Sequence, residues 1–198
     1  IWISNTRIVS YFEFGVFVYI LKQSIKVRNQ SELPRLFWGP IPILNNKYWS
    51  KAMEEMYFSK TVMNGFYETI NDKSDFNLYV DDILKIYRFP TFLKERYRSF
   101  FLTHYAILNF DIFHIPFSGL FLSETKYWNK EADLYKRFNK KFVLLPYGAD
   151  AYMYSRIKNE SFQNALLTSY PKAAILEDKI SEFFSYWSKK ADFIPAGF

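Results

Sequence analysis

Three short apolar runs, each ending in a turn rich in glycine, proline or polar residues, constrain the fold of this chain most strongly. The runs and their turns are residues 36–42, 111–119 and 142–150. Buried strands of a parallel sheet form continuous apolar runs, because helices cover both faces of the sheet and no strand position needs to be polar. The pattern therefore predicts an α/β domain that is Rossmann-like and doubly wound, with a mainly parallel sheet.

The 198 residues suffice for one α/β core. Residues 29–34 form a polar linker, so we assign residues 1–34 to an amino-terminal helix and linker and residues 35–198 to the Rossmann-like domain. Because the last residues look like a strand entering a turn, we expect the chain to be part of a longer protein.

The alternation of apolar and polar stretches predicts the remaining elements. We expect strands over residues 35–38, 60–65, 111–115, 141–145 and 192–195. We expect helices over residues 47–56, 91–108, 130–138 and 173–190, with a short strand and a helix in 75–86 and partly irregular helix in 152–170. An asparagine directly before a helix can cap it, so Asn45 or Asn46 is expected to cap the helix over 47–56.

Residues 8–21 are almost wholly apolar and are followed by Lys22, Lys26 and Arg28. The run is too short for a comfortable transmembrane span. Two interpretations stand side by side. One is a helix packed on the domain; the other is an interfacial helix whose rings enter the headgroup region while its cations meet anionic lipid.

Composition narrows the classes of partner. With 22 Phe and 16 Tyr some rings must be exposed, and clustered exposed rings mark a binding or membrane-facing surface. The net charge of +6 favours anionic partners, but the cations are scattered and no nucleic-acid motif is present, so nucleic-acid binding ranks low. The absence of cysteine excludes disulfides and thiolate metal sites, and two histidines make a zinc cage implausible.

The turns after the first two runs supply candidate site residues. Gly39 directly follows a strand, and Pro40 stiffens the turn into a helix whose N-terminus can receive a phosphate. By itself, a glycine in this position more often serves a tight turn. His114 ends its strand, where an imidazole can hydrogen-bond a sugar hydroxyl or phosphate, or exchange a proton. The alternative is a histidine satisfied by a neighbouring carbonyl. His104, mid-helix among rings, is expected to be structural.

The turn after the third run contains Tyr147, Gly148 and Asp150. Asp150 can cap the following helix, which is the commoner role for an aspartate in that place, or accept hydrogen bonds from a hydroxylated ligand. The two roles are compatible.

Taken together, these segments resemble the amino-terminal half of GT-B glycosyltransferases, in particular bacterial enzymes that build surface glycans. The resemblance rests on residues 38–42, 48–50, 111–114, 146–150 and 191–194. It implies that Gly39 and Pro40 lie near the donor diphosphate, that His114 is the catalytic residue near the transferred sugar, and that Tyr147, Gly148 and Asp150 bind the acceptor. It also implies a nucleotide-sugar donor and no metal or other cofactor.

The leading hypothesis is the acceptor-binding half of a nucleotide-sugar-dependent glycosyltransferase for capsule or lipopolysaccharide-type glycans. It would be cytoplasmic, peripheral on the inner face of the cell membrane, and catalytically incomplete without a carboxyl-terminal donor domain. Its partners would be the nucleotide-sugar, a glycan or lipid-linked acceptor and an anionic membrane surface. The alternative is a non-catalytic α/β module that binds carbohydrate or protein, since doubly wound sheets host many functions.

Overall fold

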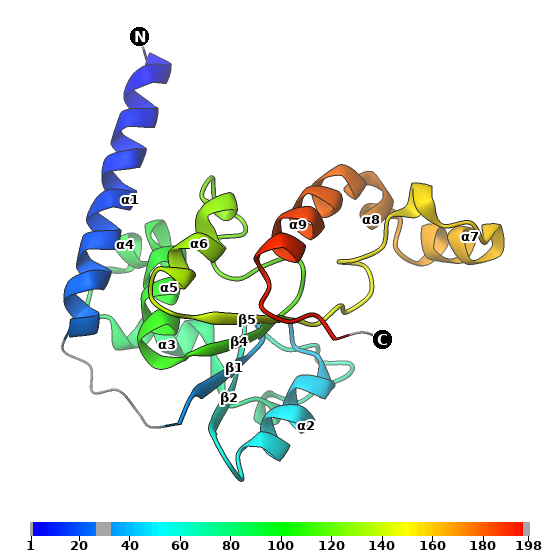
Figure 1. Cartoon of the computed structure of the whole chain (residues 1–198), viewed down its shortest axis with the longest axis horizontal. Helices are drawn as coiled ribbons and strands as arrows, with labels where there is room; N and C mark the ends of the chain where they lie inside the picture. The colour runs from blue at the N-terminus through cyan, green and yellow to red at the C-terminus, as the bar shows by residue number, and fades with distance from the viewer. Residues whose placement is uncertain (1, 27–32, 196–198) are drawn as a thin grey trace.

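A five-stranded sheet forms the centre of the molecule, in a computed structural model that describes residues 2–26 and 33–195 (Figure 1). Every pair of neighbouring strands is parallel, in the order β3-β2-β1-β4-β5. The strands are β1 (Arg35–Trp38), β2 (Phe58–Met63), β3 (Leu78–Tyr79), β4 (Ile112–Ile115) and β5 (Lys141–Leu144). The predicted Rossmann-like α/β fold with a parallel sheet is confirmed.

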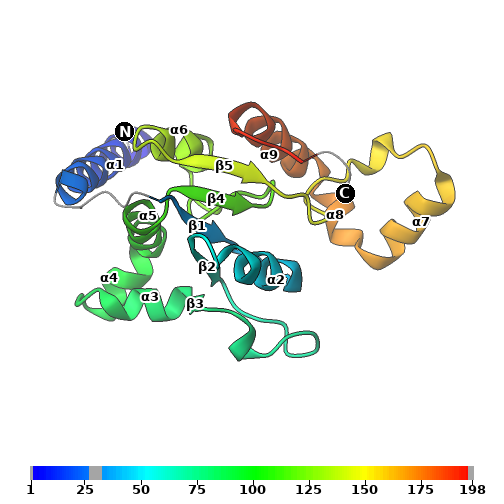
Figure 2. The same cartoon turned by 60° about the horizontal axis from the view of Figure 1, so that its bottom comes forward.

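Helices cover both faces of this sheet (Figure 2). The helices are α1 (Trp2–Lys26), α2 (Leu44–Met53), α3 (Val80–Ile86), α4 (Thr91–Arg96), α5 (Arg98–Asn109), α6 (Glu131–Lys136), α7 (Glu160–Ser169), α8 (Pro171–Ile175) and α9 (Glu177–Lys190). Helix α2 packs on one face through a cluster that contains Trp38 and Trp49, whereas α5, α6 and α9 share the main core on the other.

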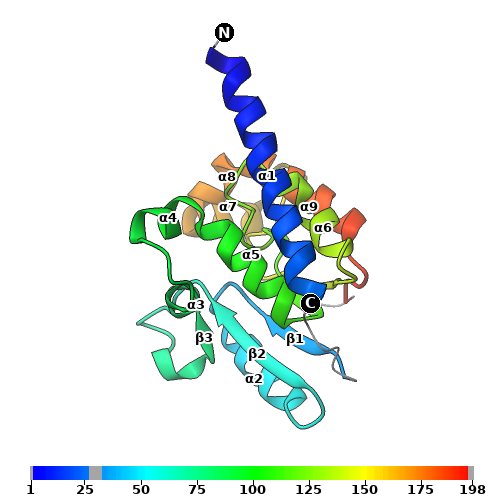
Figure 3. The same cartoon turned by 90° about the vertical axis from the view of Figure 1, so that its left-hand side faces the viewer.

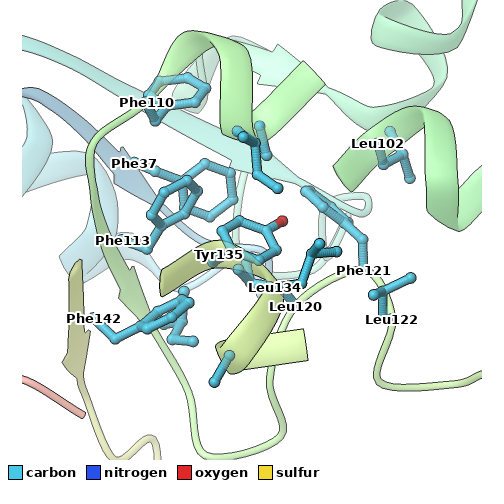
Figure 4. Packing of buried hydrophobic residues seen from close by; sticks show 14 of the residues in the cluster. Phe37, Leu102, Phe110, Phe113, Leu120, Phe121, Leu122, Leu134, Tyr135 and Phe142 are labelled. Atoms are coloured by element: carbon cyan, nitrogen blue, oxygen red, sulfur yellow. The ribbon is translucent and has the colours of Figure 1, made fainter. Parts of the chain in front are cut away.

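The main core is built around aromatic rings that alternate strand positions direct to one face of the sheet (Figure 4). Phe37, Phe113 and Phe142 are fully buried on neighbouring strands, and the ring of Phe113 lies 5.1 Å from that of Phe37. Tyr135 of α6 meets Phe113 edge to face at 5.0 Å. The apolar runs therefore serve as buried strands because both of their faces are covered.

Helix α1 packs on the domain with its inner face. Leu21 is completely buried, and the ring of Phe17 stacks on that of Phe100 at 4.6 Å. The outer face of the same helix stays exposed, as Phe12 and Tyr19 show. Among the described residues, no helix combines the length and the apolar character that crossing a bilayer requires.

Four expectations need correction. Helix α2 begins at Leu44 after Ile43, and neither Asn45 nor Asn46 caps it. The helix expected over residues 91–108 is divided at Tyr97, whose hydroxyl is bound to Glu13 of α1, a tertiary contact that local sequence does not encode. The strand expected over 192–195 is reduced to one bridge between Phe193 and Val143. The helix expected over residues 173–190 is divided at Leu176 into α8 and α9. Residues 29–32 of the predicted linker lie outside the described part.

Candidate functional site

The order of the strands defines where a ligand site is expected. Strands β1 and β4 are neighbours, but the chain leaves β1 through α2 on one face and leaves β4 through α6 on the other. Open parallel sheets bind ligands in the crevice at the carboxyl ends of the strands at such a switch point. Trp38 and His114 are partners in register there, so Gly39, Pro40 and His114 all lie at this edge.

Gly39 is held tightly between the two neighbouring strands. Its N–H donates to the carbonyl of His114 over 3.1 Å, and Pro40, joined to it by a cis peptide bond, accepts from the N–H of Asn64. A Cβ at Gly39 would stand 2.1 Å from the carbonyl oxygen of Val62. The close approach of β2 therefore requires a glycine here, whereas a role toward a donor phosphate stays a prediction.

His114 lies flat against Trp38, with ring centroids 3.6 Å apart, and its Nδ1 is 3.1 Å from the carbonyl oxygen of Phe37. A carbonyl only accepts, so Nδ1 carries the proton and Nε2 is left as the acceptor. Burial lowers the pKa of His114 to about 4, although the bond to Phe37 opposes this shift. At neutral pH the ring is uncharged, which suits it to accept a hydrogen bond from a hydroxyl group.

Asn46 connects the turn after β1 to the turn after β5. This side chain is fully buried; its Nδ2 donates to the carbonyl of Ile41, and its Oδ1 accepts from the hydroxyl of Tyr147 at 2.8 Å. Burial raises the pKa of Tyr147, so the phenol stays protonated and can donate. An asparagine near a helix start predicts a helix cap. The hydrogen bond from Tyr147 shows instead that Asn46 joins the two turns.

Asp150 connects the turn after β4 to the turn after β5. Its Oδ2 accepts from the N–H of Phe117 at 3.0 Å and its Oδ1 from the N–H of Tyr147 at 2.9 Å. The expected helix-capping role is wrong, because the short helix that follows begins after Met153. The backbone N–H groups of Gly148 and Asp150 itself also stabilise this carboxylate, and a role toward a hydroxylated ligand stays a prediction.

A cavity of about 680 Å³ opens beside this turn, between residues 151–157 and α9. Arg156 and Lys189 line it together with three serines, and none of its lining residues is acidic. The hydroxyl of one of them, Ser188, is buried and finds no hydrogen-bond partner among the described residues. Sequence reasoning did not identify this cavity, because its two walls come from segments that are distant along the chain.

The loop after His114 is anchored from inside the protein. The fully buried carboxylate of Glu131 accepts from the N–H groups of Leu122 at 2.7 Å and of Leu120 at 3.1 Å. Gly119 has a φ of +85°, and a Cβ there would stand 2.8 Å from Nε1 of Trp187. These contacts fix residues 116–122, which continue directly from β4 at the switch point.

No group of three or more histidine, cysteine or acidic residues in residues 2–26 and 33–195 is arranged to hold a metal ion. No family model matches the chain, and neither a curated protein nor a solved structure does. The fold and its switch point define a Rossmann-like α/β domain. A more specific function has to be argued from the chemistry of this edge of the sheet.

Proposed function

We propose that the chain is the acceptor-binding half of a nucleotide-sugar-dependent glycosyltransferase that builds surface glycans. It acts on a glycan or lipid-linked acceptor at the inner face of the cell membrane. The donor sugar nucleotide is shared with a second domain, and no metal or nucleic acid takes part. The observation that carries the proposal is the gathering of three turns at the carboxyl edge of the sheet, beside a cavity lined by cations and hydroxyl groups.

The cavity suits a carbohydrate that carries a phosphate. Arg156 and Lys189 supply positive charge without an acidic neighbour in the lining, and Ser181, Ser185 and Ser188 supply hydroxyl groups that donate and accept. Small-molecule sites combine such polar groups with apolar walls, which Phe184 provides here. The acceptor therefore occupies the space between the turn of Asp150 and α9.

The switch point suits the donor side. Gly39 and Pro40, both buried, shape the turn beside the donor diphosphate, and the neutral His114 accepts a hydrogen bond from the sugar through Nε2. A histidine with a pKa of about 4 orients a hydroxyl group at neutral pH and is a poor proton donor there. Within the proposal His114 positions the transferred sugar.

One observation favours a second candidate, a non-catalytic carbohydrate-binding module. The three titratable groups expected at the site are engaged within the protein: His114 with Phe37, Tyr147 with Asn46, and Asp150 with two backbone N–H groups. Such groups can shape a binding surface without taking part in a reaction.

Binding by the chain itself tests the acceptor site. We expect a phosphorylated oligosaccharide to bind in calorimetry and the Arg156→Ala, Lys189→Ala double variant to bind it at least about tenfold more weakly, since two charge-assisted hydrogen bonds are lost. Lys172→Ala, an exposed cation on α8, is the matched control and leaves affinity unchanged. Equal affinity of the double variant and the control contradicts the assignment of the cavity.

Turnover separates the two candidates. We expect the protein that includes the donor domain to release nucleoside diphosphate with selected sugar nucleotides, and His114→Ala to slow that release. Saccharide binding without release for any donor supports the binding module instead.

A further inference from the structure

An apolar groove lies between α1 and residues 87–104. Figure 3 shows α1 running alongside α5. The volume of the groove is about 530 Å³. Phe12, Val16 and Ile20 of α1 form one wall, and Phe89, Phe100 and Phe101 contribute to the other. We call this the α1–α5 groove. Its size lies within the range of sites that hold a small molecule or a single long chain.

The polar groups of the groove are already engaged within the protein. The hydroxyl of Tyr87 donates to the carbonyl of Phe101 and lies 2.8 Å from Nδ1 of His104, whose Nε2 is 3.0 Å from the hydroxyl of Ser24. Glu13 accepts from the hydroxyl of Tyr97. An extended peptide placed here would leave its backbone amides without partners, at a cost that a hydrocarbon chain does not incur.

Large apolar side chains continue from the groove onto the surface. Phe12 is 72% exposed, and Phe92 on α4 is 69% exposed. Phe12, Val16, Ile20 and Phe89 line the groove and are exposed, and the exposed Tyr19, Ile86 and Phe92 are close to them along the chain. Exposed apolar side chains gathered along a groove mark a surface that binds a partner or a membrane.

The charge around these residues selects the partner. Residues 12–25 and 80–98 contain six basic and four acidic side chains. Three of the acidic ones are paired, Glu13 with Arg96, Asp81 with Arg98 and Asp82 with Lys85. Lys22 and Arg88 are exposed and form no ion pair with a described residue. The surface therefore has a positive excess, which is complementary to anionic headgroups.

We propose that the α1–α5 groove and its exposed rim bind an anionic lipid bilayer, with one hydrocarbon chain of a lipid entering the groove. Helix α1 then lies along the interface, its outer rings at headgroup depth and Lys22 and Arg88 against lipid phosphates. This surface shares no residue with the sheet-edge site, so it does not depend on the proposed chemistry of that site, although it deepens the membrane location in the proposed function. It would hold the protein on a membrane whatever the sheet edge binds.

Vesicle co-sedimentation of the purified chain tests the proposal. We expect binding to phosphatidylglycerol-containing phosphatidylcholine vesicles and much weaker binding to phosphatidylcholine alone. The Lys22→Gln, Arg88→Gln variant is expected to bind the anionic vesicles at least tenfold more weakly, because each cation near such a surface contributes about fivefold. The Phe12→Ser, Phe89→Ser variant is expected to bind the anionic vesicles more weakly, by roughly tenfold or more, because two apolar rings no longer enter the bilayer.

Matched controls use the opposite end of the molecule. Phe162→Ser on α7 removes an exposed ring, and Lys158→Gln with Lys172→Gln removes two exposed cations; both variants are expected to bind as the original chain does. Thermal unfolding confirms that each variant is folded.

Equal binding to neutral and anionic vesicles, or equal loss in the control variants, overturns the proposal. A dimer that dissociates on Phe12→Ser with Phe89→Ser, together with no vesicle binding, assigns the groove to a second copy of the chain instead. Nucleoside diphosphate release is measured without vesicles, so failure here removes the membrane location and leaves the proposed transfer reaction to its own test.

Discussion

The imidazole of His114 stacks on the indole of Trp38 with an interplanar angle of 5°, at the point where β4 and β1 end side by side. Trp38 is itself fixed, since its Nε1 donates to the hydroxyl of Ser59 at 2.9 Å. The stack covers one face of the imidazole while Nδ1 is engaged by Phe37. The orientation of Nε2 is therefore set by the strand register and by β2.

We predict that His114 titrates at about pH 4, because burial disfavours the imidazolium. The chain has only two histidines, so two-dimensional NMR of the ring protons can resolve both. Trp38→Leu removes the covering ring and is expected to move the pKa of His114 upward, toward 6.5. A pKa near 6.5 in the unmodified chain would show that the ring is solvated and available for proton exchange.

Glu131 and His114 make the free energy of unfolding depend on pH in opposite directions. An unperturbed glutamate titrates near 4.5, whereas burial raises the pKa of Glu131 to about 7. Between these values the folded state binds more protons, so its contribution to stability is complete below pH 4.5 and is lost as the pH rises through 7. For His114 the unfolded state binds more protons, so the free energy of unfolding rises between pH 4 and 6.5.

Glu131→Gln removes the pH-dependent contribution of Glu131 to stability. We expect the free energy of unfolding of this variant to rise with pH relative to that of the original chain, by about 3 kcal/mol between pH 4.5 and 7. Urea denaturation at a series of pH values measures the difference. Glu160→Gln, at the exposed start of α7, serves as the control because its side chain is not buried. A flat difference for Glu131→Gln would mean that its carboxyl group titrates normally.

Gly39→Ala is expected to destabilise the fold by roughly 3 kcal/mol or more, because the new methyl group meets backbone that cannot retreat. The comparison is Gly15→Ala in α1, where a Cβ meets nothing within 4 Å. Alanine at that helical position is expected to stabilise by about 0.5–1 kcal/mol. Chemical denaturation of the two variants measures both effects, and a neutral Gly39→Ala would contradict the contact with Val62.

Asp150→Asn is expected to loosen the two turns that the carboxylate joins. The amide retains one acceptor, so one of the N–H groups of Phe117 and Tyr147 loses its partner, at a cost of about 1–3 kcal/mol. Hydrogen exchange at these two amides is the direct readout and is expected to accelerate. Asp81→Asn, whose side chain is largely exposed, should change stability by less than about 0.5 kcal/mol.

The parallel sheet could be predicted because strands that are buried on both faces consist of uninterrupted apolar residues. The approximate positions of β1, β4 and β5 follow from those runs, and the turns after them mark the carboxyl edge. Helix boundaries were less predictable. The break falls at Tyr97, whose hydroxyl donates to Glu13 of α1, and a contact between residues so far apart has no local signature.

The residues at the switch point were identifiable, but their partners were not. His114 ends a strand in the sequence, whereas its stacking on Trp38 depends on which strands become neighbours. Asn46 and Glu131 have sequence contexts typical of a helix start, and only the packed structure shows that one receives Tyr147 and the other anchors a loop. The cavity could not be predicted for the same reason, because α9 lies beside residues 151–157 only in the packed structure.

The two margins of the sheet differ in how they end. At one, β3 contains only two residues; at the other, Phe193 accepts from the N–H of Leu144, while Asp192 exchanges backbone and side-chain hydrogen bonds with Phe142. Unpaired strand margins recruit further strands and so promote aggregation. The short bridge at Phe193 therefore covers the β5 margin, so that a strand of another chain cannot pair there. A single bridging residue is sufficient for this.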